Sequence, residues 1–356
     1  MIVIDADGHV EESLAMFGFL EKEYYPRRPL VLQFAPDTTW GANNAVWFME
    51  GQTFPKMYGR GGVIFSTPTQ MDVAKRKSVS IGAQELIDVP ARLADLDKMK
   101  IDKQVVYPTL FLATTVEDVE LEAAYLRAYN SFMADACSKS GGRIKFGALV
   151  PVRDVGESVR ELRRAKSLGA ASVMILGLAW DRSLRDEKLY PLYEEAQNLD
   201  IPVCVHFGWG APALTGLFEW QESFNSAALP VMMGFFSLMT SGVLETFPKL
   251  RLAFLEAGSE WVPYLVHQLK RGKKVRRDPL EYFREGRVFV GCESDEDINY
   301  LVQFVGEDAL VGASDYPHTD PSLEEHLVQN FMGREEVPLR LKEKILCDNP
   351  KRLYKL

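Results

Sequence analysis

Eight short apolar runs, separated by amphipathic stretches, constrain the fold of this chain more than any other feature. The runs are continuous rather than alternating, which is typical of parallel strands buried on both faces. The expected strands are residues 2–7, 103–110, 144–152, 171–178, 201–208, 250–258, 287–294 and 309–318.

The stretches between these runs have the character of helices. Segment 155–169 places Val155 and Leu162 on one helical stripe. Segments 187–200 and 297–308 have the same character before the fifth and eighth strands. Strands that alternate with helices in this way predict an α/β fold, a (β/α)8 TIM barrel.

We expect one domain over residues 1–356. A doubly wound sheet is the weaker alternative, because no GxGxxG fingerprint follows the first strand. Two stretches exceed a minimal barrel: an insertion over approximately 12–100, and the loop 208–230 after the fifth strand. Both leave the carboxyl ends of strands, so we expect the insertion to cover the mouth of the barrel.

Composition excludes several classes of protein. A net charge of -9 argues against general nucleic-acid binding, and the basic run 270–278 is expected to be a solvated helix end. The apolar tract 227–244 is short for a membrane span, so a buried or subunit-contacting helix is expected. Scattered cysteines without a CxxC pair predict reduced thiols and a cytoplasmic protein: Cys137, Cys204, Cys292 and Cys347.

The first strand ends in ionisable side chains. In "MIVIDADGHVEE", Asp5, Asp7 and His9 alternate, and alternate residues of an extended strand share a face. The stretch fits either a solvated strand edge or half of a metal site.

The other expected strands supply partners for that half-site. His206 ends the fifth strand, Glu256 the sixth, and Asp315 and His318 the eighth. Barrel enzymes carry their chemistry at the carboxyl ends of the strands, and imidazole with carboxylate suits Zn²⁺, Fe²⁺ or Mn²⁺. Singly, an Asp can cap a helix and a His can pack in the core. Convergence on one face favours a metal site over packing.

Several segments resemble the amidohydrolase-related family of the amidohydrolase superfamily. They are "DADGHVEE", "DVPARLADLDKMKIDKQVVYPTL", "VHFG", "LAFLEAGSEWVP", "GASDYPH" and "ILCDNPKRLY". The resemblance implies a distorted barrel and metal-dependent hydrolysis or nonoxidative decarboxylation. It places the metal ligands on Asp7, His9, His206 and Asp315.

Three positions depart from the pattern that the resemblance implies. Asp7 stands where the superfamily usually has the first histidine of HxH, and the fourth strand has no lysine to bridge two metals. Glu256 stands where a histidine is common. Two roles for Glu256 remain open: a further metal ligand, or an acceptor that orients His206 or His318. One or two ions are expected, with Zn²⁺ first and Mn²⁺ or Fe²⁺ as alternatives.

The resulting expectation is a metal-dependent hydrolase acting on an amide, ester, lactone or thioester. Asp315 takes the proton of a metal-activated water, and His318 and Glu256 complete the catalytic set. The first alternative is a nonoxidative decarboxylase (a lyase) of an aromatic or unsaturated acid, although related decarboxylases use a sixth-strand histidine. The second is a barrel that binds a ligand without turnover.

Aromatic side chains suggest a small, partly apolar substrate. We expect Trp47, Phe48, Trp209 and Tyr316 to contact it, although for Tyr316 a packing role ranks first. Trp40, Phe54, Tyr58, Phe65 and Phe218 belong to the same aromatic set. Such residues also suit a subunit interface, and the tract near Phe235 predicts a homodimer.

Overall fold

The computed structural model describes the chain apart from residues 36, 39–44, 57, 64–66, 69–78, 220–221, 273–274 and 320, and the side chains of 223–225. Trp40 and Phe65 lie outside the described residues.

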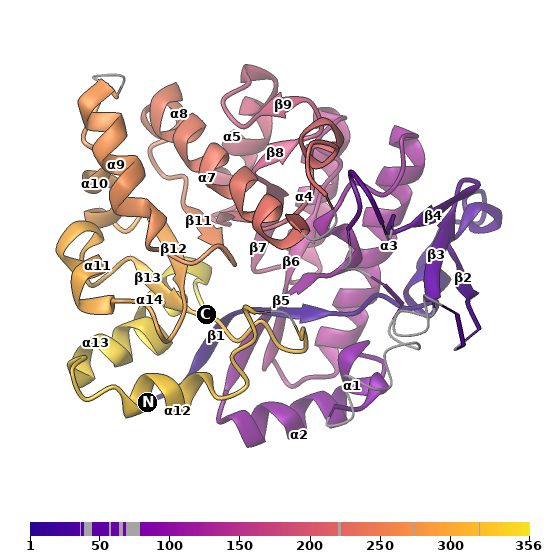
Figure 1. The fold of residues 1–356 in the computed structure, drawn as a ribbon, viewed down its shortest axis with the longest axis horizontal. Coiled ribbons are helices and arrows are strands. Elements are labelled where there is room, and N and C mark those ends of the chain that lie inside the picture. The colour runs from indigo at the N-terminus through magenta and orange to yellow at the C-terminus, as the bar shows by residue number, and fades with distance from the viewer. Residues whose placement is uncertain are drawn as a thin grey trace.

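Eight parallel strands form the central sheet in sequential order, as the apolar runs predict (Figure 1). Seven of the strands are shorter than their apolar runs, whereas β1 begins at Ile4 and continues past the expected end at Asp7 to Val10. The sheet closes nearly into a barrel: the His9 N–H donates to the Tyr316 carbonyl at 2.7 Å, and the Asp315 N–H donates to the Asp7 carbonyl at 2.9 Å. The strands are β1 (Ile4–Val10), β5 (Lys103–Pro108), β6 (Ile144–Leu149), β7 (Ser172–Leu176), β10 (Val203–His206), β11 (Leu252–Leu255), β12 (Val288–Cys292) and β13 (Leu310–Gly312).

Helices surround the barrel and include the predicted ones. Capping side chains define several starts; the Asp154 carboxylate, for example, accepts from the Glu157 N–H at 3.0 Å. The helices that connect successive barrel strands are α2 (Val89–Met99), α3 (Val119–Ser138), α4 (Val155–Ser167), α5 (Tyr190–Asn198), α7 (Ser223–Ser241), α9 (Trp261–Gly272) and α11 (Ile298–Val305). Shorter helices are α1 (Ile81–Gln84), α6 (Pro212–Thr215), α8 (Val243–Thr246), α10 (Pro279–Arg284), α12 (Leu327–Gly333), α13 (Leu339–Glu343) and α14 (Asn349–Tyr354).

The long insertion between β1 and β5 contains a small antiparallel sheet at one side of the barrel (Figure 1). Its strands are β2 (Leu30–Gln33), β3 (Ala45–Met49) and β4 (Gln52–Phe54). The segment after β4 reaches the loop that follows β10, where the Gly61 N–H donates to the Phe218 carbonyl at 2.8 Å. The insertion therefore contacts the loops at the carboxyl ends of the strands.

The first strand corrects one expectation. Its pairing with β5 shifts register between Asp5 and Gly8, which marks a β-bulge. The bulge breaks the strict alternation, and the Asp5 carboxylate bonds Ser314 and Gln104 instead of the groups around Asp7 and His9. Asp5, Asp7 and His9 therefore do not act as one row of ligands.

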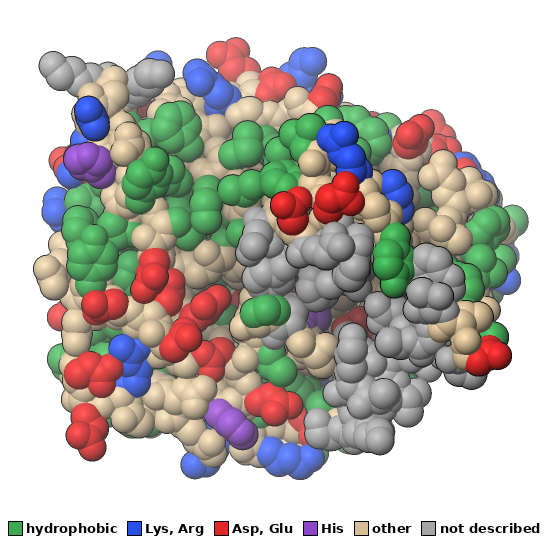
Figure 2. Space-filling view, in the orientation of Figure 1, with side chains coloured by type: hydrophobic (Ala, Val, Ile, Leu, Met, Phe, Trp, Pro, Cys, Tyr) green, Lys and Arg blue, Asp and Glu red, His purple; other side chains and the backbone are tan. Residues whose placement is uncertain are grey.

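The apolar tract 227–244 belongs mostly to α7. Phe235 is buried and packs on Phe254 and Trp261. Leu229, Met233 and Phe236 remain exposed, and Figure 2 shows hydrophobic side chains gathered over this part of the surface. Within the described residues, no helix is long and apolar enough to cross a bilayer. Homodimerisation through this face remains a prediction.

Candidate metal centre

The structure brings all five predicted ligands and His318 together at the carboxyl ends of the strands. Asp7 and His9 come from β1, and His206 is the last residue of β10. The remaining three, Glu256, Asp315 and His318, follow β11 and β13 directly. The six side chains are at most 7% exposed, so their charges are largely removed from water.

Three carboxylates converge on one imidazole nitrogen. The Nε2 atom of His9 lies 3.1 Å from Glu256 Oε2, 3.2 Å from Asp315 Oδ1 and 3.4 Å from Asp7 Oδ1. Nε2 of His206 joins them, at 3.2 Å from Asp7 Oδ1 and 3.5 Å from Glu256 Oε2. These atoms enclose a common centre.

Backbone carbonyls fix how the two strand histidines are protonated. Nδ1 of His9 lies 2.8 Å from the Pro108 carbonyl, and Nδ1 of His206 lies 3.0 Å from the Phe207 carbonyl. Because a carbonyl only accepts, Nδ1 is the donor in both rings. In the neutral imidazoles the lone pair is then on Nε2, which faces the carboxylates.

Glu256 faces the centre of this cluster. The outward nitrogens of His9 and His206 are already bonded to carbonyls, and Glu256 contacts their inward Nε2 atoms. The geometry therefore favours the ligand role for Glu256 over that of an acceptor that orients a histidine.

A chain of close polar contacts leads from Asp315 to the backbone of β1. Nδ1 of His318 lies 2.7 Å from Asp315 Oδ1, and its Nε2 lies 2.8 Å from the Thr109 hydroxyl. That hydroxyl donates to the Val10 carbonyl at 2.9 Å, so it accepts from the His318 Nε2–H. With Nε2 bonded to Thr109, Nδ1 is the His318 nitrogen that faces the Asp315 carboxylate.

Two of the carboxylates stand on left-handed backbone. The φ angles of Glu256 and Asp315 are 56° and 53°, a conformation that residues other than glycine rarely adopt. Both residues lie immediately past a strand, where the chain turns. This turn directs the side chains to the barrel axis at some cost in backbone energy, a pattern common at functional sites.

The electrostatics of the cluster favour a cation. Burial alone raises the pKa of Asp7, but the charges and hydrogen bonds of His206 and His9 outweigh it and lower the pKa to about 2. Burial lowers the pKa of His9, but the charge of Glu256 and the hydrogen bond with Asp7 raise it well above its ordinary value. The buried carboxylates thus attract positive charge strongly.

The donor set fits a divalent metal ion. Nε2 of His9 and three carboxylate oxygens converge, a donor set that would suit a cation at their centre. Atoms that lie about 2.1 Å from one ion are roughly 3.0–3.4 Å apart, close to the separations found here. The Asp7 Oδ2 atom also has no hydrogen-bond partner within the described residues. A cavity of about 20 Å³ lies against Asp7, Glu256 and Asp315, enough for one water-sized species.

The predicted substrate contacts occupy different surroundings. Trp209 lines a cavity of about 600 Å³ between the insertion and the loops after β5 and β10. Trp47 is buried against Phe17, and Phe48 is half-buried on β3. The Tyr316 hydroxyl donates to Asp95 at 2.7 Å, which fits the packing role that ranks first for this side chain. Trp209 is therefore the best placed of the four.

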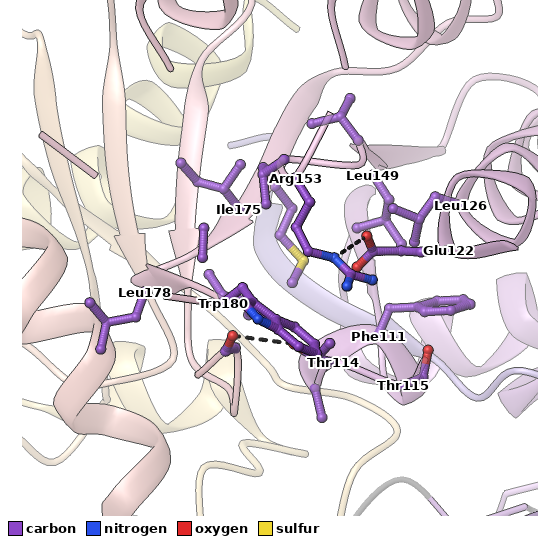
Figure 3. A pocket seen from close by; sticks show the side chains of 17 residues that line it. Phe111, Thr114, Thr115, Glu122, Leu126, Leu149, Arg153, Ile175, Leu178 and Trp180 are labelled. Carbon is purple, nitrogen blue, oxygen red and sulfur yellow. Dashed lines mark hydrogen bonds and ion pairs between the residues drawn. The ribbon is translucent and has the colours of Figure 1, made fainter. Parts of the chain in front are cut away.

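A smaller cavity of about 70 Å³ adjoins the larger one, and the two share Thr114 and Trp180 (Figure 3). Arg153 lies over the Trp180 ring at 4.3 Å and donates to Glu122 at 2.8 Å. Arg153 also donates to the Val116 and Glu117 carbonyls, both at 2.7 Å. Since these polar partners lie within the protein, this cavity presents a mainly apolar wall.

Thr109, which links His318 to the Val10 carbonyl, was not among the residues predicted from the sequence. Its position at the end of the second apolar run was the available signal, since a polar residue there lies at the catalytic end of a barrel. Glu12, whose buried carboxylate accepts from the backbone N–H groups of Thr109 and Leu110, was also not among them.

The fold is a TIM barrel, and the cluster at the carboxyl ends of its strands is typical of a metal-dependent enzyme. The chain belongs to the amidohydrolase family, whose model matches residues 89–356. A curated relative, 2-amino-3-carboxymuconate-6-semialdehyde decarboxylase from Dictyostelium discoideum, is 26% identical, covering 65% of this chain and 67% of the relative.

Solved structures share the fold over the whole chain. An amidohydrolase from Mycobacterium avium subsp. paratuberculosis matches with a TM-score of 0.76 and 21% identity, covering 100% of this chain and 98% of the other. A 5-carboxyvanillate decarboxylase from Novosphingobium aromaticivorans, with manganese and 4-hydroxy-3-methoxy-5-nitrobenzoic acid, matches with a TM-score of 0.72 and 18% identity, covering 100% and 96%.

Proposed function

We propose that this protein is a metal-dependent decarboxylase of an aromatic or unsaturated carboxylic acid. The observation that carries the proposal is the buried cluster in which Asp315 lies 2.7 Å from His318 beside a centre suited to a divalent ion. The reaction named for the Dictyostelium relative supports decarboxylation over hydrolysis. This reverses the order of the two activities expected from the sequence.

We propose a single ion in this centre. The cluster divides into two overlapping groups of possible ligands, and both include His9. Because Nδ1 of His9 is occupied by the Pro108 carbonyl, only Nε2 is available, and one lone pair binds one ion. Manganese in the Novosphingobium structure supports Mn²⁺ as the first candidate, with Zn²⁺ as the second.

Asp7, His9, His206 and Glu256 would hold the ion, with Asp315 at its edge. When bound, the ion supplies a Lewis acid that orients the substrate carboxylate and a neighbouring oxygen. In this proposal Asp315 and His318 hold one proton between them, and Asp315 delivers it to the carbon bearing the carboxylate. The carbon–carbon bond then breaks, its electron pair stays with the substrate carbon, and CO2 leaves. Thr109 holds the His318 ring in place during this transfer.

Hydrolysis is the second candidate, favoured by Glu256. The related decarboxylases are expected to use a histidine at this position, whereas a carboxylate 3.1 Å from His9 Nε2 is a suitable base for a water molecule.

The test is a parallel assay of the Mn²⁺-loaded protein on two panels. The first contains 5-carboxyvanillate, hydroxybenzoates and unsaturated dicarboxylic acids, followed by CO2 release in D2O. The second contains esters, lactones and amides. CO2 release with one deuterium at the former carboxyl carbon is the expected result. Turnover of the second panel alone would establish hydrolysis instead.

A further inference from the structure

Arg92 lies on α2, outside the metal-binding cluster, and its side chain is completely buried. Burying a guanidinium is costly unless its donors are satisfied. Two of them are satisfied by one side chain: Nε and Nη2 donate to Gln104 Oε1 at 3.0 and 2.7 Å. The group also lies 4.3 Å above the Tyr316 ring.

The same guanidinium binds the backbone on both sides of the barrel closure. Nη2 donates to the His9 carbonyl at 2.8 Å and to the Tyr316 carbonyl at 3.2 Å. His9 is a proposed ligand on β1, and Tyr316 follows Asp315. Arg92 therefore ties the loop that carries Asp315 to the end of β1.

The residue on the other side of Asp315 is held by the same network. The Gln104 amide donates to Asp5 at 2.7 Å, and Asp5 accepts from the Ser314 N–H at 2.9 Å and from the Ser314 hydroxyl. Gly8 makes room for this arrangement, since a Cβ there would lie 2.2 Å from the Gln104 amide nitrogen. Of the two neighbours of Asp315, Ser314 is thus held through Asp5, and Tyr316 is held by Arg92; Gln104 bonds both of these supports.

We propose that Arg92 is a positioning residue for Asp315. By fixing the backbone before and after Asp315, the network that Arg92 completes maintains its left-handed φ of 53° and keeps its carboxylate aimed at the metal centre and His318. The catalytic part of this inference rests on the proposed role of Asp315 in proton transfer. The geometric part does not.

The test compares Arg92→Lys with Arg251→Lys. Arg251 is a suitable control because it is also buried and donates to two carbonyls, those of Leu353 and Asp200, but it lies just before β11, at the opposite end of the barrel from the cluster. Both substitutions keep the charge and remove the planar fork that contacts several acceptors at once.

The first readout is the electron paramagnetic resonance spectrum of bound Mn²⁺, which needs no substrate. We expect Arg92→Lys to change the spectrum in the same direction as Asp315→Asn, and Arg251→Lys to leave it unchanged. A wild-type spectrum in Arg92→Lys would overturn the proposal. Failure of the wild type to release CO2 from any acid would refute the proposed function alone, since the spectrum would still test Arg92.

The second readout is kinetic, on whichever substrate the wild type turns over. We expect kcat of Arg92→Lys to fall by about 10- to 100-fold with KM within about threefold, as for other residues that orient ligands. If Arg92→Lys and Arg251→Lys lose kcat in the same proportion to their loss of Tm, the role of Arg92 is merely structural. That result would overturn the proposal.

Discussion

The two kinds of side chain in the metal-binding cluster are supported differently. His9 and His206 stand on strands, and each is fixed by one backbone carbonyl next to its own sheet position. Glu256 and Asp315 stand on loops with left-handed backbone, and Asp315 depends on contacts from distant parts of the chain. The comparison teaches that a histidine on a strand is held by its immediate surroundings, whereas Asp315, on a loop, is held by groups of other elements, such as Asp5 on β1 and Arg92 on α2.

The strand-borne histidines should be the least replaceable part of the site. His206→Ala removes one inward nitrogen and leaves Asp7 without its 3.2 Å partner. We expect activity to fall by about 10³-fold or more, since loss of a ligand should exceed the roughly 10- to 100-fold cost of losing a residue that only orients one. His267→Ala on the exposed face of α9 is the matched control and should keep wild-type activity. Equal activity of the His206→Ala and His267→Ala variants would contradict an essential role for the histidines on the strands.

Glu256→Gln tests a loop-borne carboxylate while keeping its size. The substitution removes one negative charge that faces His9 and His206. We expect Mn²⁺ affinity to fall by roughly 10- to 100-fold, because a neutral amide oxygen is a weaker ligand. Calorimetric titration with Mn²⁺ measures this directly. Unchanged affinity would assign Glu256 a role other than metal binding.

Thr109→Val isolates the support of the proton-donating pair. Valine keeps the shape of threonine but cannot accept from His318 Nε2, which lies 2.8 Å from the hydroxyl. We expect kcat to fall by about 10-fold, with little change in metal content, because no proposed ligand is touched. Metal analysis and kinetics on the same preparation provide both values. Thr109→Ser restores the hydroxyl and should regain most of the rate.

The smallest expected effect is on thermal stability and comes from substitution of Glu12. Burial raises the pKa of its carboxyl to about 8, against hydrogen bonds from Leu110 and other backbone groups that lower it. Below pH ~4.5 the group is protonated in both states and contributes nothing. As pH rises towards 8, only the unfolded state ionises, so the wild type loses stability. We expect Glu12→Gln to gain a few °C in Tm relative to the wild type between pH 5 and 8. A constant difference would contradict the raised pKa.

The strand-borne half of the site could be predicted from sequence. His9 and His206 lie at the ends of apolar runs, and in a barrel such ends converge. The β-bulge after Asp5 could not be predicted, because it depends on hydrogen bonds from Gln104 and Ser314, which are distant in the chain.

The sequence alone also could not show that decarboxylation should be favoured over hydrolysis. The same metal ligands serve hydrolysis and decarboxylation. Glu256, which stands where related decarboxylases have a histidine, favoured hydrolysis. The arrangement of Asp315, His318 and Thr109 became visible only when β5 and the loop after β13 were placed side by side.

Metal content per chain is the most direct test of the account. The full-length wild type, purified without chelator and then incubated with excess Mn²⁺ and desalted, should hold one ion per chain by elemental analysis. His206→Ala treated in the same way should hold almost none. One ion lost in the variant is the result that the account predicts. No ion in the wild type, or a variant that retains the wild-type content, would contradict a metal centre built on these residues.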